Sequence, residues 1–362
     1  MAARSVEMLR DHSGRRSKSG PSFPAAGQTR PPSDAVDFVA IAEAAYRLDL
    51  DDQTWLEGML AAAAPGLDDG DGVVAAIIDS TGAVPAPSLV LAVAARGPTR
   101  VLEAFVRANN LPTTDEMRQR LIGSGPVSSM RLVVGPSFDE EGGHGSVLRE
   151  HGYEDSVVVL AGDPTGISCV ITSPRKSRAM LSPRFKSTWG RAAAHIASGH
   201  RLRRHLRNGS LAAAEDAVLD PGGRVENAAA DATALDAREA LRHAVFASEK
   251  ARGPMRTKSP DQALALWGAL VSGRWSLIDR FDSDGRRFLV ARRNEPLSAP
   301  RAPLSQRECQ VAALVSLGHS NKLISYELGL AASTVATHLA SAMNKLGVPS
   351  RVELVQLFGR GG

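Results

Sequence analysis

The chain has few cysteines and no long apolar run, and these absences exclude several classes of protein. Cys169 and Cys309 are the only two cysteines in 362 residues. They cannot form a disulfide framework, and each lies in an apolar pattern, so we expect plain burial in a reducing cytoplasm. No apolar run approaches the roughly 18 residues of a transmembrane helix, and the N-terminus has no signal-peptide core. The sequence predicts a soluble, cytoplasmic protein that does not enter a membrane.

Sequence patterns of catalysis are also missing. There is no G-x-S-x-G elbow, no P-loop, no dinucleotide fingerprint, and no pairing of histidine and carboxylates at a useful spacing. The acidic cluster, aspartate and lysine of a phospho-receiver domain cannot be placed at the ends of successive strands. We therefore expect no enzyme activity, no catalytic residues and no cofactor.

Two acidic loops are the candidates for a metal site. The glycine-rich loop at 135–145 matches no ligand spacing, and a solvated loop is the preferred interpretation. Its metal-ligating residue types are Asp139, Glu140, Glu141 and His144. Asp282 and Asp284 resemble the start of a calcium loop, but Arg286 follows where further acidic positions are needed. We expect no metal site.

The most informative stretch lies near the C-terminus and predicts three short helices. Ser305 and Glu308 form an S-x-x-E capping box at the start of the first helix, which ends at Gly318. Ser320 caps the second, which ends at the next glycine. The third carries a buried stripe at helical spacing, formed by Val335, Leu339, Ala342 and Leu346. Two short helices joined through a glycine are typical of a helix-turn-helix, whose second helix enters the DNA major groove.

This stretch also resembles the LuxR-type family of bacterial transcription regulators. Four family motifs, L-S/T-x-R-E, G-x-S-N-K-x-I, T-V-x-x-H and K-L-x-V-x-x-R, recur at the family's spacing. They are carried by Leu304, Ser305, Arg307 and Glu308; Gly318, Ser320, Asn321, Lys322 and Ile324; Thr334, Val335 and His338; and Lys345, Leu346, Val348 and Arg351. The resemblance covers roughly a sixth of the chain and implies a DNA-binding domain over residues 304–362. The formal net charge of +4 would not by itself indicate DNA.

A second capping box predicts a fourth helix in this domain. Ser350 and Glu353 have the required spacing. In the family this helix mediates dimerisation, and here its apolar residues are Val352, Val355 and Leu357 or Phe358. The alternative is that these side chains only close the core of the small domain. We favour the dimer, because paired half-sites are usual for such modules.

The buried stripe of the third helix leaves a set of positions that face the DNA groove. These are Ala336, Thr337, Ala340, Ser341 and Asn344. None of them can form a charged bidentate bond to guanine, although methyl contacts to thymine remain open. Contacts to phosphates, which position the protein without reading sequence, are expected from four other residues. These are Asn321, Lys322, Thr334 and Lys345.

The chain departs from the family pattern at three positions. Ala336 stands where lysine is usual, and Ala331 stands at the recognition-helix cap where serine is usual. Leu323 stands where the family tends to have glutamate. We expect it to be exposed, either as a contact with another domain or subunit or as a scattered surface leucine. These departures leave open a domain that binds DNA weakly.

The region upstream begins with a tail and a mixed domain. Residues 1–34 are rich in Ser, Gly, Pro and Arg, and we expect a disordered basic tail. Residues 35–209 mix helices and strands. A hairpin turns through Asp163 to Gly166 and leads into a long helix from Ser182 to Arg207. This pattern resembles a GAF-like sensor domain.

A second upstream domain and a linker complete the chain. Residues 210–296 begin and end with hairpins, the second turning at Asp284 and Gly285, with helices between them. That order resembles a PAS-like domain. Residues 297–303 contain proline and form a linker. The fold class is therefore α+β multidomain, with a mixed α/β sensor region, GAF-like and then PAS-like, followed by an all-α four-helix helix-turn-helix domain.

Two side-chain groups upstream allow alternative interpretations. The arginines that end the long helix either contact DNA or complement the helix dipole, and the structural interpretation is preferred. They are Arg201, Arg203, Arg204 and Arg207. Aromatic residues of the second domain either line a ligand cavity or, as we prefer, form core. They are Trp267, Trp275, Phe281 and Phe288.

The predicted function is a homodimeric transcription regulator that binds double-stranded DNA. Its N-terminal region senses a small-molecule or protein signal and gates DNA binding. The alternative is a protein-interaction regulator whose helix-turn-helix binds DNA weakly or not at all.

Overall fold

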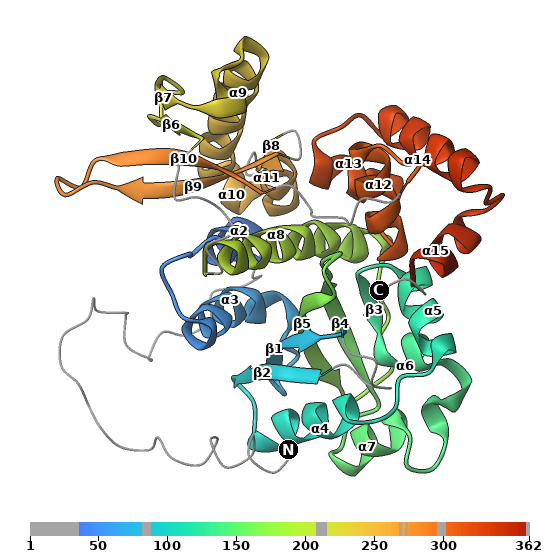
Figure 1. Cartoon of the computed structure of the whole chain (residues 1–362). Helices are drawn as coiled ribbons and strands as arrows, with labels where there is room; N and C mark the ends of the chain where they lie inside the picture. Colours follow the sequence, from blue (N-terminus) through green and yellow to red (C-terminus); the bar gives the residue numbers. More distant parts are fainter. Residues whose placement is uncertain are drawn as a thin grey trace. The chain divides into compact units, whose positions relative to one another are not determined.

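The structure, a computed structural model, describes residues 36–81, 88–207, 216–267, 270–271, 274–294 and 302–359. The predicted basic tail at 1–34 and most of the predicted linker at 297–303 lie outside the described residues. Figure 1 shows the arrangement of helices and strands.

The first sheet has five antiparallel strands in the order β2-β1-β5-β4-β3. Its strands are β1 (Val73–Asp79), β2 (Ser88–Ala95), β3 (Val127–Ser129), β4 (Asp155–Ala161) and β5 (Ile167–Arg175). The predicted hairpin is confirmed as β4 and β5. Its turn is held by the Asp163 carboxylate, which accepts a hydrogen bond from the Thr165 backbone at 3.0 Å. Gly166 completes the turn at a positive φ of 84° that suits glycine.

Helices cover both faces of this sheet. On one face lie α2 (Phe38–Ala45), α3 (Asp52–Leu67) and α8 (Pro183–Arg207), and they enclose a core that includes Trp55, Trp189 and Ile196. The chain turns between α2 and α3. The carboxylate of Asp51 caps α3 by accepting from the Thr54 backbone at 2.9 Å. The other helices of this region are α4 (Thr99–Asn109), α5 (Asp115–Ser124), α6 (Met130–Val134), η1 (Gly135–Asp139) and α7 (His144–Glu150).

The expectation of a solvated loop at 135–145 holds for the exposed Asp139, Glu140 and Glu141, but it is wrong for the rest of the segment. The segment forms η1 and the start of α7, and both Phe138 and His144 are buried. Asp139 pairs with Arg131 at 2.6 Å and with Arg149 at 2.7 Å, so its carboxylate is already neutralised. The packing of Phe138 orders the segment despite its glycines. In the part of the chain that the structure describes, no group of three potential ligands could hold a metal ion.

The second sheet repeats the strand order of the first. Its order is β7-β6-β10-β9-β8, so in each sheet the fifth strand of the region lies centrally, between the first and the fourth. The strands are β6 (Ala217–Leu219), β7 (Val225–Ala228), β8 (Leu270–Val271), β9 (Trp275–Phe281) and β10 (Arg287–Arg293). The hairpins predicted at both ends of the region are confirmed as β6–β7 and β9–β10.

The helices between these hairpins contribute to both cores. They are η2 (Ala230–Thr233), α9 (Leu235–Arg252), α10 (Met255–Lys258) and α11 (Pro260–Leu266). Leu241 and Val245 of α9 pack under the second sheet. Ala251 of α9, Leu264 of α11 and Trp267 instead join the core of the first region. The two upstream regions therefore share a packed boundary.

The arginines at the end of α8 have structural partners. Arg201 pairs with Asp163 at 2.8 Å, and Arg203 pairs with Asp52 at 3.1 Å. Arg207 also pairs with Asp52, at 2.6 Å. The preferred structural interpretation is confirmed. Their main partners are buried or neighbouring carboxylates, which the dipole argument did not foresee.

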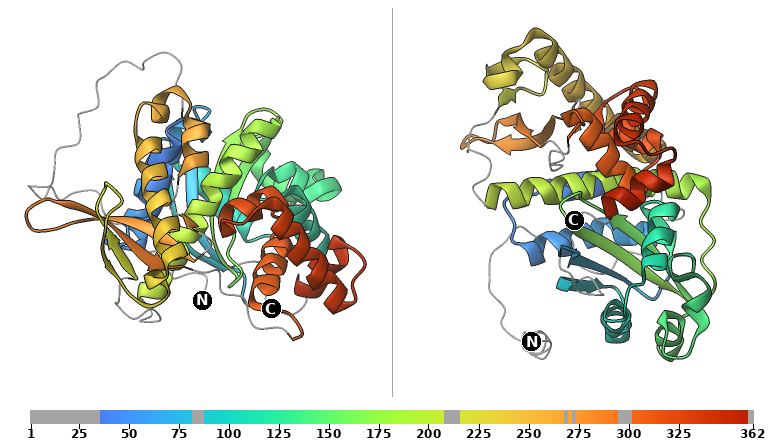
Figure 2. Two further views of the ribbon diagram at one scale, coloured as in Figure 1. Left: turned by 90° about the horizontal axis from the view of Figure 1, so that it is seen from above. Right: turned by 45° about the vertical axis from the view of Figure 1, so that its right-hand side comes forward.

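The C-terminal region consists of four helices around a core of its own. They are α12 (Gln306–Ser316), α13 (Asn321–Leu328), α14 (Ala332–Leu346) and α15 (Arg351–Gly359). The predicted caps at Ser305, Ser320 and Ser350 are confirmed. Figures 1 and 2 show α13 next to α8. Within the described residues, no helix combines the length and the hydrophobicity needed to cross a membrane.

Candidate functional site

Helix α14 presents the predicted groove-facing residues on one side and the domain core on the other. Val335, Leu339 and Ala342 are buried in the core. Ala336, Thr337, Ala340 and Asn344 are exposed, and Ser341 is half-buried. The exposed face is small and uncharged, so it can offer methyl contacts and hydrogen bonds, but no charge, to a base edge.

Glu308 of α12 binds two of the predicted DNA-contacting residues. Its carboxylate accepts a hydrogen bond from Ser341 Oγ at 2.6 Å and pairs with Lys345 Nζ at 2.7 Å. It also accepts from the Ser305 backbone at 2.7 Å, which closes the predicted capping box. The bonds from Lys345 and then Ser341 lower the pKa of Glu308 to about 2. The charge of Lys345 is therefore neutralised within the domain, a role of Glu308 that its position in the capping box did not suggest.

The N-terminal end of α13 carries the other predicted phosphate contacts. Asn321 Oδ1 accepts a hydrogen bond from Arg351 Nη1 at 3.0 Å, so Asn321 is oriented by α15. Lys322 is exposed, and no described carboxylate pairs with it. Thr334, at the start of α14, is half-buried. Lys322 and Lys345 are both exposed, but only Lys345 is paired with a described carboxylate.

The expectation that Leu323 is exposed is wrong. Its side chain is 9% exposed and lies 3.8 Å from where a Cβ on Gly190 of α8 would stand. Gly318, in the turn before α13, has a φ of +82°, and a Cβ there would lie 2.0 Å from the Ile122 carbonyl oxygen of α5. Of the two alternatives for Leu323, the contact with another domain is the one observed. The first helix of the helix-turn-helix is packed against the upstream region.

Three rings connect α13 to both upstream regions, and of these Tyr46 and His195 are buried and Tyr326 is half-buried. The Tyr326 hydroxyl donates to the Leu264 carbonyl oxygen of α11 at 2.8 Å. His195 of α8 places Nε2 2.5 Å from the Tyr326 hydroxyl and Nδ1 3.3 Å from the hydroxyl of Tyr46. Because the hydrogen of Tyr326 is committed to Leu264, Tyr326 accepts from His195 Nε2–H, and His195 Nδ1 accepts from Tyr46. We call Tyr46, His195 and Tyr326 the ring relay.

Burial keeps the ring relay uncharged. It lowers the pKa of His195 to about 3 and raises the pKa of Tyr46 to about 12. The pKa of Tyr326 is raised as well, again by burial. No sequence pattern pointed to these residues, because His195 and Tyr326 lie 131 positions apart.

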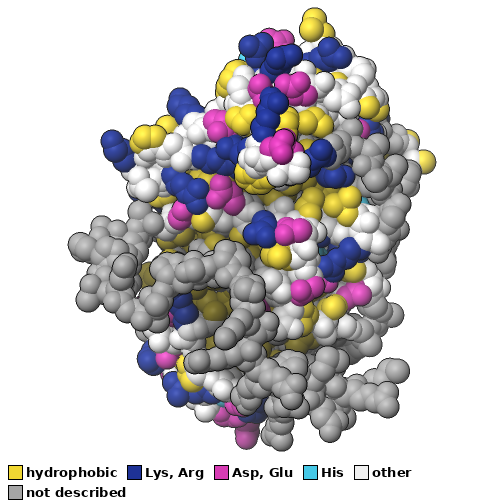
Figure 3. All heavy atoms as spheres, turned by 90° about the vertical axis from the view of Figure 1, so that its left-hand side faces the viewer, with side chains coloured by type: hydrophobic (Ala, Val, Ile, Leu, Met, Phe, Trp, Pro, Cys, Tyr) yellow, Lys and Arg dark blue, Asp and Glu magenta, His cyan; other side chains and the backbone are white. Residues whose placement is uncertain are grey.

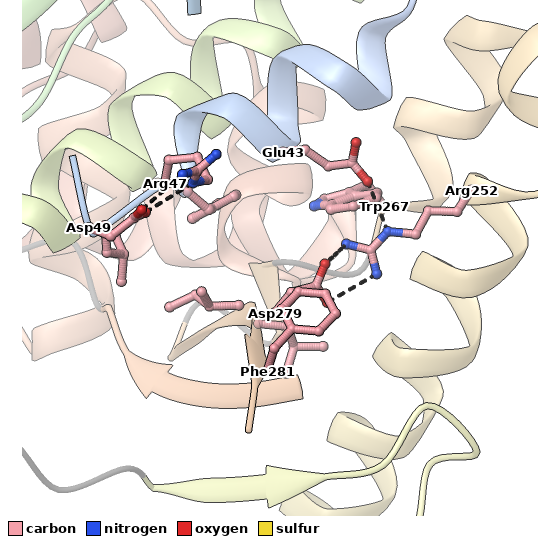
Figure 4. A pocket seen from close by; sticks show the side chains of 11 residues that line it. Glu43, Arg47, Asp49, Arg252, Trp267, Asp279 and Phe281 are labelled. Atoms are coloured by element: carbon pink, nitrogen blue, oxygen red, sulfur yellow. Dashed lines mark hydrogen bonds and ion pairs between the residues drawn. The ribbon is translucent and has the colours of Figure 1, made fainter. Parts of the chain in front are cut away.

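A cavity of about 670 Å³ lies between the two upstream regions, and we call it the upstream cavity. Arg252 spans it, pairing with Glu43 at 3.0 Å and with Asp279 at 2.6 Å, and stacking over Trp267 (Figure 4). Trp267 and Phe281 line the cavity, whereas Trp275 is buried in the second core. Trp267 and Trp275 are thus both core residues, as preferred, and Trp267 also lines the cavity.

Comparison with known proteins identifies the C-terminal region. Residues 302–358 match the family model described as bacterial regulatory proteins, luxR family. The C-terminal domain belongs to the LuxR family. The match confirms the resemblance drawn from the four motifs and leaves the upstream regions uncovered.

The matches to curated relatives cover a minor part of this chain. The HTH-type transcriptional regulator MalT of Vibrio campbellii is 35% identical over 105 residues, covering 27% of this chain and 12% of MalT. MalT of Yersinia pestis is 49% identical over 55 residues, covering 15% of this chain and 6% of MalT. The chain therefore spans only a small part of the length of these relatives.

Among solved structures, Escherichia coli SdiA is similar over most of the chain but at low scores. The alignment with one SdiA structure covers 87% of this chain and 92% of the SdiA chain, with 11% identity and a TM-score of 0.27. The alignment with SdiA in complex with octanoyl-rac-glycerol covers 91% of this chain and 97% of the SdiA chain, with 11% identity and a TM-score of 0.29. Scores this low carry no argument about the upstream regions.

Two of the departures from the family pattern have visible consequences in the LuxR-type domain. Ala331 occupies the N-cap of α14, and no side chain there caps the helix. Ala336 lies exposed one turn further along. A serine at position 331 would supply the missing cap, and a lysine at position 336 would supply a cation on the groove-facing side.

Proposed function

We propose that this protein is a transcription regulator that acts in the bacterial cytoplasm and binds double-stranded DNA through its LuxR-type domain. The observation that carries the proposal is the amphipathic α14. Its apolar side forms the domain core, while Ala336, Thr337, Ala340 and Asn344 remain exposed. A second helix held in this way by α12 and α13 has the geometry of a recognition helix in the major groove.

Binding to DNA is expected to depend on few charges. Lys322 presents a cation at the N-terminal end of α13, and Asn321 and Thr334 add neutral donors nearby. Lys345 has to share its charge with Glu308, at 2.7 Å. We therefore expect four or fewer cationic phosphate contacts per subunit and a shallow dependence of affinity on salt.

We also propose that the upstream region gates DNA binding through α13. The ring relay and Leu323 join this helix to α8 and α11. The upstream cavity, at about 670 Å³, lies within the usual range of roughly 300–1,000 Å³ for small-molecule sites and is the proposed place for a signal. A ligand that moves α8 relative to α11 would change the contacts that position α13.

The proposed assembly is a homodimer completed by α15. Leu354 fills the core of the domain and was not among the apolar residues predicted for this helix. Val352 is 65% exposed and Leu357 is 37% exposed, which leaves an apolar edge for a second copy. Two copies would present paired recognition helices to half-sites about 34–36 Å apart.

The experiment that tests DNA binding is a fluorescence-anisotropy titration of the full chain with duplex DNA from its own upstream region. We expect saturable binding at low salt, with a shallow linear fall of log affinity against log salt. Absence of binding at 50 mM salt would favour the second candidate, an interaction protein. That candidate is supported by the uncharged groove-facing residues of α14. It is also supported by Glu308, which accepts a hydrogen bond from Ser341 and forms an ion pair with Lys345.

The gating proposal has its own test in Tyr326→Phe. The change removes one hydroxyl and leaves the Leu264 carbonyl and His195 Nε2 without their partner, at a cost of about 1–3 kcal/mol. Hydrogen exchange of α13 should become faster in the full chain, while Thr337→Ala on α14 should leave it unchanged. Unaltered exchange in Tyr326→Phe would remove the ring relay from the gating mechanism.

A further inference from the structure

A second cavity lies where the LuxR-type domain meets the first upstream region. It has a volume of about 300 Å³ and is bounded by the C-terminal end of α5, by α8 and by the N-terminal end of α13. We call it the junction cavity. The side chains that carry the argument are Lys186 and Arg191 of α8, Lys322 of α13, and the hydroxyls of Ser187 and Ser320.

The junction cavity has three cations and no carboxylate in its lining. Elsewhere basic side chains are commonly paired, as Arg201 is with Asp163 and Arg252 is with Glu43. On the face drawn in Figure 3, basic and acidic side chains lie beside one another. Within the described ranges, no ion pair joins Lys186, Arg191 or Lys322 to an acidic residue, although Lys186 and Arg191 are half-buried.

The cations are held in place by the packing of the junction. The Arg191 guanidinium lies 5.8 Å from the centre of the Tyr326 ring, so the ring relay fixes it at the cavity wall. Lys186 and Arg191 are five positions apart on α8, whereas Lys322 comes from the other domain. Like charges that line one cavity repel one another unless an anion lies between them.

The backbone of α13 adds to the positive potential. Ser320 is the N-cap of this eight-residue helix and accepts from the Leu323 backbone at 3.3 Å. Ser320 lines the cavity together with Lys322 and Leu323 of the first turn. First-turn N–H groups lack partners within their own helix, and the helix dipole places partial positive charge there. Three cations with a helix N-terminus make a setting for a phosphate group rather than for a carboxamide or an apolar ligand.

We propose that the junction cavity binds a phosphate group, either one from the DNA backbone or one from a free phosphorylated solute. The site goes beyond the proposed DNA contacts because two of its cations, Lys186 and Arg191, belong to the sensor region. A phosphate bound there joins α8 to α13 and strengthens the contact between the two regions. Only the DNA source rests on the proposed function.

The test is isothermal titration calorimetry of the full chain with inorganic phosphate, together with DNA binding measured across salt concentrations. Lys186→Gln removes a charge from the cavity, and we expect it to weaken phosphate binding about ten-fold, the scale of one charge-assisted hydrogen bond. Lys186→Arg keeps the charge and should retain binding. Arg184→Gln is the matched control, because Arg184 also lies on α8 but pairs with Asp261 at 2.9 Å outside the cavity.

The outcomes separate the two sources. If the site takes a DNA phosphate, Lys186→Gln also reduces the salt slope of DNA binding by about 1, and phosphate competes with DNA. If it takes a free solute, Lys186→Gln weakens phosphate binding to the same extent and leaves the salt slope of DNA binding unchanged. No heat of phosphate binding at tens of millimolar, with an unchanged salt slope, overturns the proposal. If the full chain binds phosphate but does not bind DNA, the proposed function is wrong and the phosphate site is supported.

Discussion

Helices α13 and α14 are adjacent in the chain but relate to the rest of the molecule in opposite ways. Helix α14 has one buried side, in the core of its own domain, and an uncharged side that faces solvent. Helix α13 is buried on two sides, with Ile324 and Leu328 inside its domain and Leu323 against α8. In the proposed function, DNA reading therefore falls to α14 and control falls to α13.

Charge divides between the two helices in the same way. Lys345 of α14 is neutralised by Glu308, whereas Lys322 of α13 has no acidic partner among the described residues. The proposed recognition helix thus carries a lysine that is paired with a carboxylate, and the helix packed on the upstream region carries a lysine that is not. Affinity for phosphates is therefore expected to depend on α13, which is also the helix that the upstream region holds.

The largest effect is expected from removing everything that α13 packs against. Deleting residues 1–296 should leave a folded and largely monomeric domain, because its core and caps are internal. Its affinity for a paired DNA site should fall about 100-fold or more, since the second module no longer adds avidity. Analytical ultracentrifugation and anisotropy measure both quantities. Equal affinities for fragment and full chain, with a full chain that is monomeric at micromolar concentration, would contradict the dimer.

Acidification should weaken the contact of α13 with the upstream region. Burial lowers the pKa of His195 to about 3, compared with about 6.5 when unfolded. The neutral ring therefore contributes stability that is fully present above about pH 6.5 and is lost as pH falls towards 3. The loss is about 1.4 kcal/mol per pH unit, or about 2 kcal/mol between pH 6.5 and 5.

A matched variant isolates this contribution from other titrating groups. His200 is also buried, and its pKa is lowered to about 4. It therefore adds a similar fall of unfolding free energy with falling pH in every variant that keeps it. Urea unfolding at pH 7, 6 and 5 should show a shallower loss of stability for His195→Gln than for the unaltered chain. Parallel losses in the two proteins would show that His195 is already protonated or exposed near neutral pH.

Local patterns predicted the elements, and distant contacts decided how those elements are used. The caps at Ser305 and Ser320 and the turn at Asp163 depend on residues within four positions, and all were predicted. No local pattern of α13 could show what covers Leu323, because its contact is with α8. The bond of Glu308 to Lys345 spans 37 positions, so it depends on how α12 and α14 pack.

A smaller effect is expected from the two lysines that distinguish α13 from α14. Lys322→Ala should weaken binding to all DNA sequences alike by about 1.5 kcal/mol, because a phosphate contact carries no sequence information. Lys345→Ala should cost less in affinity, since its charge is already shared with Glu308. Anisotropy with a specific and a scrambled duplex measures both. A double variant that keeps full affinity would show that the backbone contacts lie elsewhere.

The smallest effect is expected from giving α14 the charge that it lacks. Ala336→Lys places a cation on the exposed side of the helix, away from the buried Val335 and Leu339. It should strengthen DNA binding by about 1 kcal/mol, the scale of one added charge-assisted contact, and steepen the salt slope. Thr337→Lys, at the neighbouring exposed position, tests whether the gain depends on position or only on charge. Circular dichroism should be unchanged, because the altered side chain stays in solvent, and a loss of helicity would mean that Ala336 lies on the packed side of α14.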